Sequence, residues 1–304
     1  MKQTSEPVLK NNLMNLTITG YSTALFATWY FVEELGLLFD AGEGITANLL
    51  QKSRKIKHVL ISHADRDHLT GLLQFNQLNA RSGLHIHYPA DCGSFPALAD
   101  FCQKFDPHIQ GAIWHPTTSQ SRIAIKDDFV VEPVQNGHVK AAEGVTKSLS
   151  YKVMQIKRKL KPELANLSGL EIKKIKDEKG IEATTNEIRT NVISYSGDTP
   201  VEDYERFNHS KILIHEATFI DQVANNKENR HPHSYLEEVI EMVASIDVEQ
   251  LILGHFSSRY SSEHIDTAIR ELCHQYTLNI PVHRVLPGQV HWDILQNRQP
   301  SINK

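Results

Sequence analysis

Short apolar runs rich in β-branched residues recur along the whole 304-residue chain, and they limit its fold more than any other feature. Such runs are typical of buried strands. Between them lie four segments with helical periodicity, at about 69–80, 94–105, 234–245 and 263–276. Because strands and helices are interspersed in both halves, the pattern predicts a layered α/β sandwich rather than an all-β or all-helical protein.

The composition excludes several classes of protein. Hydrophobic residues make up 40% of the chain, which is enough for a sizeable core. No stretch approaches the roughly 18 apolar residues that a membrane helix needs, and "MKQTSEPVLKNN" is too polar for a secretory signal. The three cysteines are widely spaced and favour neither a disulfide framework nor a thiolate zinc site. A net charge of -4 does not indicate a general nucleic-acid binder. We therefore expect a soluble, cytoplasmic protein without a membrane partner.

A dense set of potential metal ligands follows one of the predicted strands. The segment "ISHADRDHLTGL", residues 61–72, places His63, Asp65, Asp67 and His68 directly after an apolar run. Loop backbone is free of the strict alternation of a strand, so it can turn several of these side chains inward at once. The alternative is a polar turn that caps the next helix. Histidine is the commonest metal-ligating side chain, so a metal site is the favoured interpretation.

Three further ligands follow later apolar runs. They are His138 in "NGH", Asp198 in "YSGDT" and His255 in "LGHFSSRY". Polar residues just after the carboxyl ends of strands are where α/β sheets build their sites. Seven nitrogen and oxygen ligands, with Asp198 able to bridge, suit two divalent metals. A water shared by two cations has a depressed pKa and acts as a nucleophile near neutral pH.

These motifs resemble the metallo-β-lactamase fold hydrolases and, within them, ribonuclease Z, the tRNA 3′-processing endonuclease. The resemblance runs through nearly the whole chain: "GYSTALFATWYF", "LLFDAGEG", the HxDxDH loop, the lone "GH", "SGDT", "HEAT" and "HFSSRY". It is strongest to the short form of the Thermotoga type, which has "RRKLK" where this chain has "KRKLK". The resemblance implies a four-layer αββα sandwich, with residues 1–304 forming a single hydrolase domain.

The resemblance also divides the ligands between two metals. One metal would be held by His63, Asp65 and His138. The other would be held by Asp67, His68 and His255. Asp198 would bridge the two, and Asp67 would orient the attacking water or take its proton.

Histidine is the family residue at position 65, and Asp65 is the sharpest departure from the pattern. A carboxylate is a legitimate zinc ligand at about 2.0–2.2 Å, so coordination need not be lost. It adds a third carboxylate and lowers the positive charge of the site. Harder, oxygen-rich surroundings move preference toward manganese or iron. We expect two divalent metal ions, most readily zinc, with manganese or iron compatible with Asp65. The alternative is the loss of one metal.

Cleavage of a phosphodiester also needs a proton for the departing 3′-oxygen. By resemblance, His233 in "RHPHSYLEEVIEMV" is the general acid, and Glu216 of "HEAT" orients it. Ser234 and Glu237 form an SxxE capping box, which predicts that a helix begins directly after His233. The neighbouring His231 is expected at the surface.

A strongly basic segment lies between residues 152 and 162, "KVMQIKRKLKP", and a polar, lysine-rich stretch follows to about residue 190. Taken alone, this composition favours a solvated helix or loop face. It occupies the place of the family's protruding tRNA-binding arm, although it lacks that arm's glycine-proline tip. The resemblance implies that Lys157, Arg158 and Lys159 contact tRNA phosphates. It also implies a homodimer in which one subunit's arm presents RNA to the other's site. Arg259 would contact a phosphate or make a structural salt bridge.

The sequence thus predicts a metal-dependent endoribonuclease that removes the 3′ trailer from precursor tRNA and leaves a 3′-hydroxyl. Two alternatives stay open. One is a phosphodiesterase acting on small molecules such as cyclic nucleotides, and the other is a non-catalytic relative with a degenerate metal site. His85 and His87 share one face of "LHIHYP" but fall outside these motifs, so they are predicted to be structural.

Overall fold

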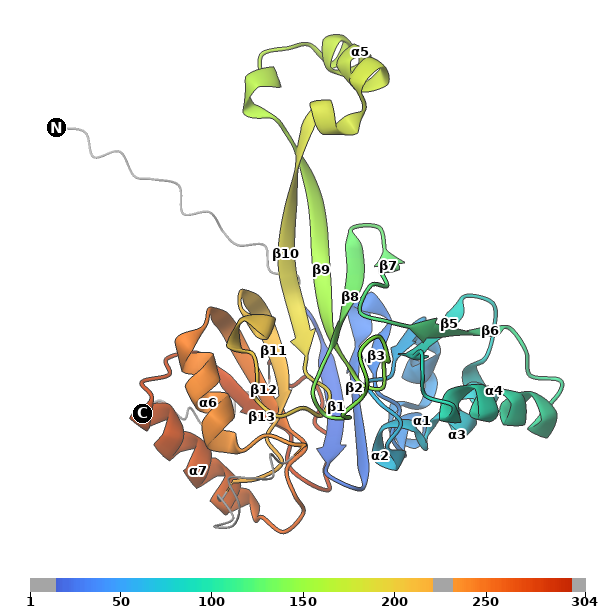
Figure 1. The fold of residues 1–304 in the computed structure, drawn as a ribbon, viewed down its shortest axis with the longest axis vertical. Coiled ribbons are helices and arrows are strands. Elements are labelled where there is room, and N and C mark those ends of the chain that lie inside the picture. Colours follow the sequence, from blue (N-terminus) through green and yellow to red (C-terminus); the bar gives the residue numbers. More distant parts are fainter. Residues whose placement is uncertain (1–14, 221–231, 297–304) are drawn as a thin grey trace.

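The computed structural model describes residues 15–220 and 232–296. Two β-sheets face each other, helices lie on their outer sides, and a long two-stranded hairpin projects from the body (Figure 1). The polar opening segment and His231 lie outside the described residues. Within the described part, no helix combines the length and the apolar character that a membrane crossing requires.

The first sheet has six strands in the order β1-β2-β3-β4-β5-β6. They are β1 (Ile18–Thr23), β2 (Ala27–Val32), β3 (Leu37–Phe39), β4 (His58–Leu60), β5 (Leu84–Pro89) and β6 (Ala112–Thr117). The first three pair antiparallel, and β3 to β6 pair parallel. The carboxyl ends of β3 and β4 therefore open onto the same edge of the sheet, where the histidine-aspartate loop begins.

The second sheet has seven strands in the order β13-β12-β11-β10-β9-β8-β7. They are β7 (Ile123–Lys126), β8 (Phe129–Gln135), β9 (Leu149–Leu160), β10 (Thr185–Tyr195), β11 (Ser210–Glu216), β12 (Val248–Gly254) and β13 (Val282–Arg284). Strands β10 to β13 pair parallel, so the segments after β10, β11 and β12 lie along one edge. This edge carries Asp198, Glu216 and His255.

Three hydrophobic cores confirm the predicted four-layer αββα sandwich. One core lies between the sheets and includes Phe39, Leu60 and Tyr151. A second fills the outer face of the first sheet beneath α1 (Ile45–Leu49), α3 (Leu72–Asn79) and α4 (Ser94–Phe105). The third packs α6 (Leu236–Ser245) and α7 (Ser262–Gln275) on the second sheet. Each sheet therefore buries both faces, as the apolar runs require.

The predicted helices agree with the structure except at two places. The segment 69–80 is interrupted, because α2 (Arg66–Leu69) ends before Gly71 and α3 starts after it. The predicted SxxE capping box was wrong by one residue: Tyr235 is the N-cap, and its backbone N–H donates to Glu238 at 3.3 Å. The Ser234 hydroxyl instead donates to the Thr199 carbonyl oxygen at 2.6 Å, which ties the start of the helix to the loop after β10.

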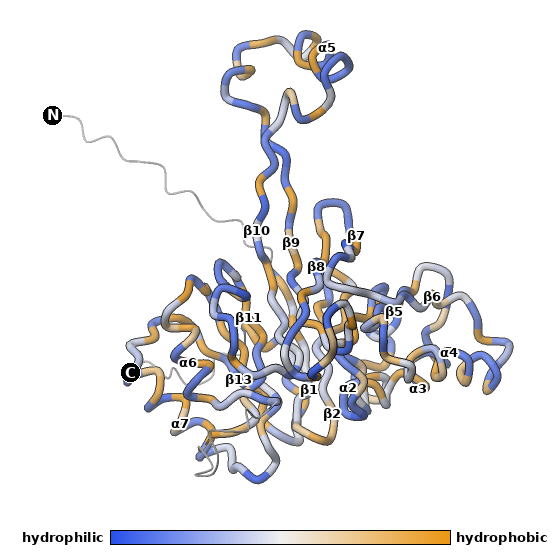
Figure 2. The backbone as a smooth tube through the Cα atoms, viewed as in Figure 1, coloured by the Kyte–Doolittle hydropathy of each residue, from blue (hydrophilic) through white to orange (hydrophobic). Residues whose placement is uncertain are grey.

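The basic segment is a strand, and not the solvated helix or loop face that its charge alone favours. Strand β9 pairs antiparallel with β10 from Tyr151 to Leu160, and α5 (Gly169–Lys179) lies at the far end of this hairpin (Figure 1). Tyr151 and Val153 are buried in the body, whereas residues 157–160 are exposed. The projecting part is largely hydrophilic (Figure 2). Backbone pairing with β10 holds this stretch extended despite its charge.

Candidate metal centre

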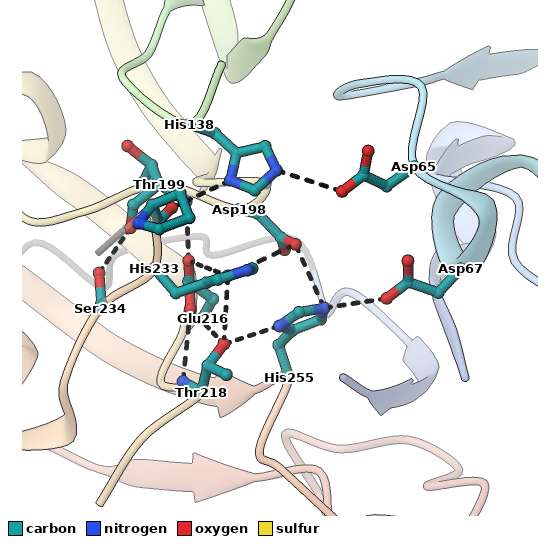
Figure 3. Close-up of polar contacts among 12 residues, drawn as sticks. Asp65, Asp67, His138, Asp198, Thr199, Glu216, Thr218, His233, Ser234 and His255 are labelled. Atoms are coloured by element: carbon teal, nitrogen blue, oxygen red, sulfur yellow. Dashed lines mark hydrogen bonds and ion pairs between the residues drawn. The ribbon is translucent and has the colours of Figure 1, made fainter. Parts of the chain in front are cut away.

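The structure brings all seven predicted ligands together. Figure 3 shows five of them: Asp65, Asp67, His138, Asp198 and His255. The candidate ligand atoms of His63, Asp65 and His138 lie within 4.8 Å of one another. The same limit holds for a second group, Asp67, His68 and His255. These are the two groups that the family resemblance assigns to separate metals.

Asp198 lies between the two groups. Its Oδ2 atom is 3.6 Å from Nε2 of His63, 3.2 Å from Nε2 of His68 and 3.3 Å from Nε2 of His255. Asp198 is buried, with a relative exposure of 3%. One carboxylate therefore reaches histidines of both groups, which is the geometry that a bridging ligand needs.

Each of the four histidines is held through Nδ1. His68 donates to the Asp40 carboxylate at 2.7 Å, and His138 donates to the Pro232 carbonyl oxygen at 2.9 Å. His63 lies 2.9 Å from the Ser62 hydroxyl, which gives its own proton to Asp40. The Ser62 oxygen must therefore accept from His63.

The same reasoning applies to His255. Its Nδ1 is 2.8 Å from the Thr218 hydroxyl, which donates to Glu216 and so accepts from the ring. With the proton on Nδ1 in all four rings, each Nε2 atom carries a lone pair. This second layer of hydrogen bonds is how proteins orient histidine ligands for metals.

The donor set therefore fits divalent cations. Nε2 of His63 is buried and has no hydrogen-bond partner, and Nε2 of His68 and His255 face each other at 3.4 Å. Lone pairs that face each other, together with the carboxylates of Asp65, Asp67 and Asp198, need positive charge between them. Imidazole and carboxylate ligands suit zinc, iron and manganese.

The electrostatics of the centre agree with a set of ionised carboxylates. The adjacent imidazoles of His138 and His63 hold the pKa of Asp65 below its usual range. Burial opposes charge on Asp198, but the adjacent imidazoles outweigh it and hold the pKa of Asp198 well below normal. These carboxylates are therefore available as anionic ligands at neutral pH.

His233 and Glu216 form a pair beside the metal ligands. Nδ1 of His233 is 3.1 Å from Oε1 of Glu216 and 3.7 Å from Oδ2 of Asp198. Glu216 is buried and also accepts hydrogen bonds from the Thr199 backbone N–H and the Thr218 hydroxyl. These contacts fix the carboxylate, which in turn fixes the imidazole.

Two glycines allow the ligand loop to lie close to the segment after β3. A Cβ atom on Gly42 would lie 2.3 Å from the Asp67 carbonyl oxygen, and one on Gly71 would lie 2.2 Å from the Gly42 carbonyl oxygen. Only residues without side chains permit this backbone approach. The turn between β1 and β2 also contacts the loop, because the Leu25 N–H donates to Oδ2 of Asp67 at 2.9 Å.

The predicted substrate-binding residues lie outside the centre. Lys157, Arg158 and Lys159 are exposed on the hairpin, and Arg158 lies 3.7 Å from Glu187 on the paired strand. Arg259 is exposed, donates to the Ser257 hydroxyl at 2.9 Å and lies over the Phe219 ring at 5.8 Å. The geometry separates a compact metal centre from a basic surface.

The residues that hold the ligands were not among the predicted site residues. Asp40 in "LLFDAGEG" directly follows β3, so its position after a strand was a usable signal. Asp40 is fully buried and accepts from the Ser62 backbone and side chain, from His68 and from Tyr195. Ser62 and Thr218 carry no comparable signal, because isolated hydroxyl residues are common near strand ends.

Comparison with known proteins supports the geometry. The family model for a beta-lactamase superfamily domain matches residues 36–160. The chain is 29% identical to tRNase Z TRZ2, chloroplastic, of Arabidopsis thaliana, over 86% of this chain and 73% of the relative. It is 27% identical to ribonuclease Z of Pyrococcus furiosus, over 83% of this chain and 87% of the relative. This chain is similar to ribonuclease Z over most of its length.

Solved structures share the fold of this chain. The metallo-beta-lactamase fold protein YhfI from Bacillus subtilis superposes with a TM-score of 0.60 at 15% identity, covering 91% of this chain and 99% of that chain. The short form of human tRNase Z gives a TM-score of 0.57 at 18% identity, covering 90% and 98%. The chain therefore has the metallo-β-lactamase fold over nearly its whole length.

Proposed function

We propose that this protein is a metal-dependent endoribonuclease that removes the 3′ trailer from precursor tRNA and leaves a 3′-hydroxyl on the tRNA. The observation that carries the proposal is the arrangement of four histidines and three carboxylates in two adjacent groups, with Asp198 between them. The relatives named ribonuclease Z and tRNase Z support the substrate. We also propose that the enzyme acts in the cytoplasm.

Two divalent cations would occupy the centre, one held by His63, Asp65 and His138 and the other by Asp67, His68 and His255. Asp198 would contact both. When bound, such cations supply Lewis acidity and an activated water. We propose zinc as the first candidate. Asp65 replaces a neutral ligand by an anionic one, which makes manganese or iron acceptable alternatives.

Side chains of the protein would orient the attacking water and transfer the protons. Asp67 is held by the Leu25 N–H at 2.9 Å and lies 3.3 Å from His255, so its carboxylate is fixed within the centre and can orient the attacking water or take its proton. His233, positioned by Glu216, would give a proton to the departing 3′-oxygen. The P–O bond to the tRNA 3′-oxygen breaks, and the phosphate remains on the trailer.

The hairpin of β9 and β10 would bind the body of the tRNA. Residues 152–190 contain ten Lys and Arg against six Asp and Glu, a net charge of +4, whereas the whole chain carries -4. Positive charge is thus concentrated on the hairpin that projects from the body (Figure 1). Lys157, Arg158 and Lys159 would contact phosphates there, and Arg259 would contact a phosphate near the metal centre. We further propose a homodimer in which the hairpin of one subunit presents RNA to the centre of the other.

The first experiment incubates the full chain with a trailer-bearing tRNA precursor and with a small chromogenic phosphodiester, under Zn²⁺, Mn²⁺ and Fe²⁺ in turn. We expect cleavage of both substrates. Hydrolysis of only the small phosphodiester would contradict the tRNA assignment and favour a small-molecule phosphodiesterase. Loss of all activity, with unchanged metal binding, would favour a non-catalytic relative.

The second experiment replaces Lys157, Arg158 and Lys159 by Gln. The slope of log KM against log salt for precursor tRNA should fall by roughly 2–3, about 0.7–0.9 for each phosphate that the hairpin no longer neutralises. Hydrolysis of the small phosphodiester should not change. The matched control removes the same charge from the body, by replacing Lys52, Arg54 and Lys55. Equal effects in both triple variants would show that net charge, and not the hairpin, sets tRNA affinity. Light scattering of the same samples measures the molar mass in solution and so tests whether the protein is a homodimer.

A further inference from the structure

A second histidine cluster lies on the first sheet, apart from the candidate metal centre. It contains His58 at the start of β4, His85 and His87 on β5, and His115 on β6. The strand register pairs His58 with His85 and His87 with His115. All four side chains therefore project from the same face of three adjacent parallel strands.

The four rings stack in a compact array. Ring centroids of His87 and His115 are 4.7 Å apart with an interplanar angle of 14°, and those of His58 and His85 are 5.1 Å apart at 15°. His85 and His115 are 5.2 Å apart at 30°. His58 and His87 are buried, whereas His85 and His115 are half-buried near the β6 edge of the sheet.

Two pairs of ring nitrogens face each other within this array. Nδ1 of His85 lies 3.0 Å from Nε2 of His115, and Nδ1 of His58 lies 3.5 Å from Nε2 of His87. At a tetrahedral metal with metal–imidazole bonds of about 2.0–2.1 Å, the two ligating nitrogens lie roughly 3.3–3.4 Å apart. The two observed separations bracket this value, so a cation can replace the proton that each pair shares with little movement of the rings.

Three imidazoles of this cluster, those of His58, His87 and His115, favour the neutral form that metals bind. Burial lowers the pKa of His58 to about 4 and that of His87 to about 3, and it also lowers the pKa of His115. Near pH 7 the nitrogens therefore keep their lone pairs. Zinc, nickel and copper(II) are the divalent ions that imidazole favours.

We propose that His85 and His115 form a second transition-metal site, which takes one Zn²⁺, Ni²⁺ or Cu²⁺ ion with water completing the coordination. The half-exposed edge strand β6 gives the ion access from solvent. The buried pair of His58 and His87 stacks against these rings and holds their positions. The site is distinct from the candidate metal centre, because His85 lies on β5 and His115 on β6, and neither belongs to the ligand groups of that centre.

The test is equilibrium dialysis of the full chain against Cu²⁺, followed by metal analysis. His115→Asn and His85→Asn should each bind one equivalent fewer per chain than the unmodified protein. The control is His108→Asn, which removes a single exposed histidine elsewhere and should change nothing. Equal copper stoichiometry in all four proteins would overturn the proposal. Hydrolysis of the chromogenic phosphodiester should be the same in all four, because none of these residues belongs to the proposed catalytic machinery.

A second measurement keeps the proposal testable if either variant fails to fold. Diethylpyrocarbonate modifies free imidazole nitrogens, and mass spectrometry locates the modified residues. Ni²⁺ added to the unmodified protein should lower the modification of His85 and His115 at least several-fold relative to that of His108. Identical modification with and without Ni²⁺ would refute a metal site at this edge.

Discussion

Asp40 fixes the ligand His68, and replacing it by Asn tests how much the centre depends on this one buried carboxylate. Asp40 has no exposed surface, and it accepts from the Ser62 N–H at 2.6 Å, from the Ser62 hydroxyl at 2.8 Å and from His68 at 2.7 Å. The Tyr195 hydroxyl also donates to it. All of its partners are donors, so the NH₂ group of an asparagine would face donors wherever it points.

The magnitude follows from these contacts. A hydrogen bond to a charged acceptor contributes about 1.5–3 kcal/mol, and the amide oxygen of Asn can keep roughly half of the bonds that the carboxylate makes. We expect Asp40→Asn to lower the free energy of unfolding by about 3–6 kcal/mol. Because whole proteins are stable by only about 5–15 kcal/mol, this variant should be close to marginal stability. Loss of the group that orients His68 should also weaken metal affinity by about 10–100-fold.

Urea unfolding at pH 7 measures the stability, and competition with a chromophoric chelator measures the metal affinity. Tyr195→Phe is the matched control, because it removes one donor to Asp40 and leaves the hydrogen bond from His68 in place. It should cost about 1–3 kcal/mol and change metal affinity little. If Asp40→Asn loses less than about 1 kcal/mol and keeps its metal affinity, the ligand orientation does not depend on this carboxylate.

Two further predictions concern protons. Glu216→Gln should lower kcat for precursor tRNA by about 10²–10⁴-fold, because His233 loses the group that orients it. Hydrolysis of a p-nitrophenyl phosphodiester should fall much less, since that leaving group needs no proton; equal losses would argue against a general-acid role. Separately, His58 and His87 have folded pKa values of about 4 and about 3, below the unfolded value of 6.5. As the pH falls, these two imidazoles therefore take up protons in the unfolded chain at a higher pH than in the folded chain. This difference should lower the free energy of unfolding by on the order of 3–5 kcal/mol between about pH 6.5 and pH 4. His87→Gln should flatten this pH dependence in urea unfolding, and an unchanged slope would contradict the assignment.

The sequence carried most of the information on fold class and on the chemical identity of the centre. Apolar runs mark strands because burial on both faces requires apolar side chains, and the ligands follow those runs directly. Helix α4 begins and ends where its periodicity predicts. The sequence-based predictions were wrong where contacts with distant parts of the backbone determine the local structure. Gly71 breaks the predicted helix because it packs against Gly42, and Ser234 contacts the Thr199 carbonyl oxygen instead of capping α6.

Only the tertiary structure decided how the side chains point. The residues that orient the histidines, such as Asp40 and Thr218, come from different strands from their partners, and no sequence period encodes such a pairing. The cluster of His85 and His115 depends on the register between β5 and β6, thirty residues apart in the chain. Residue type and the succession of strands along the chain are properties of the sequence itself, so the sequence determined which ligands are present. Lone-pair direction and strand register arise from packing between distant segments, so only the folded chain decided which ligand atoms lie together and which way they point.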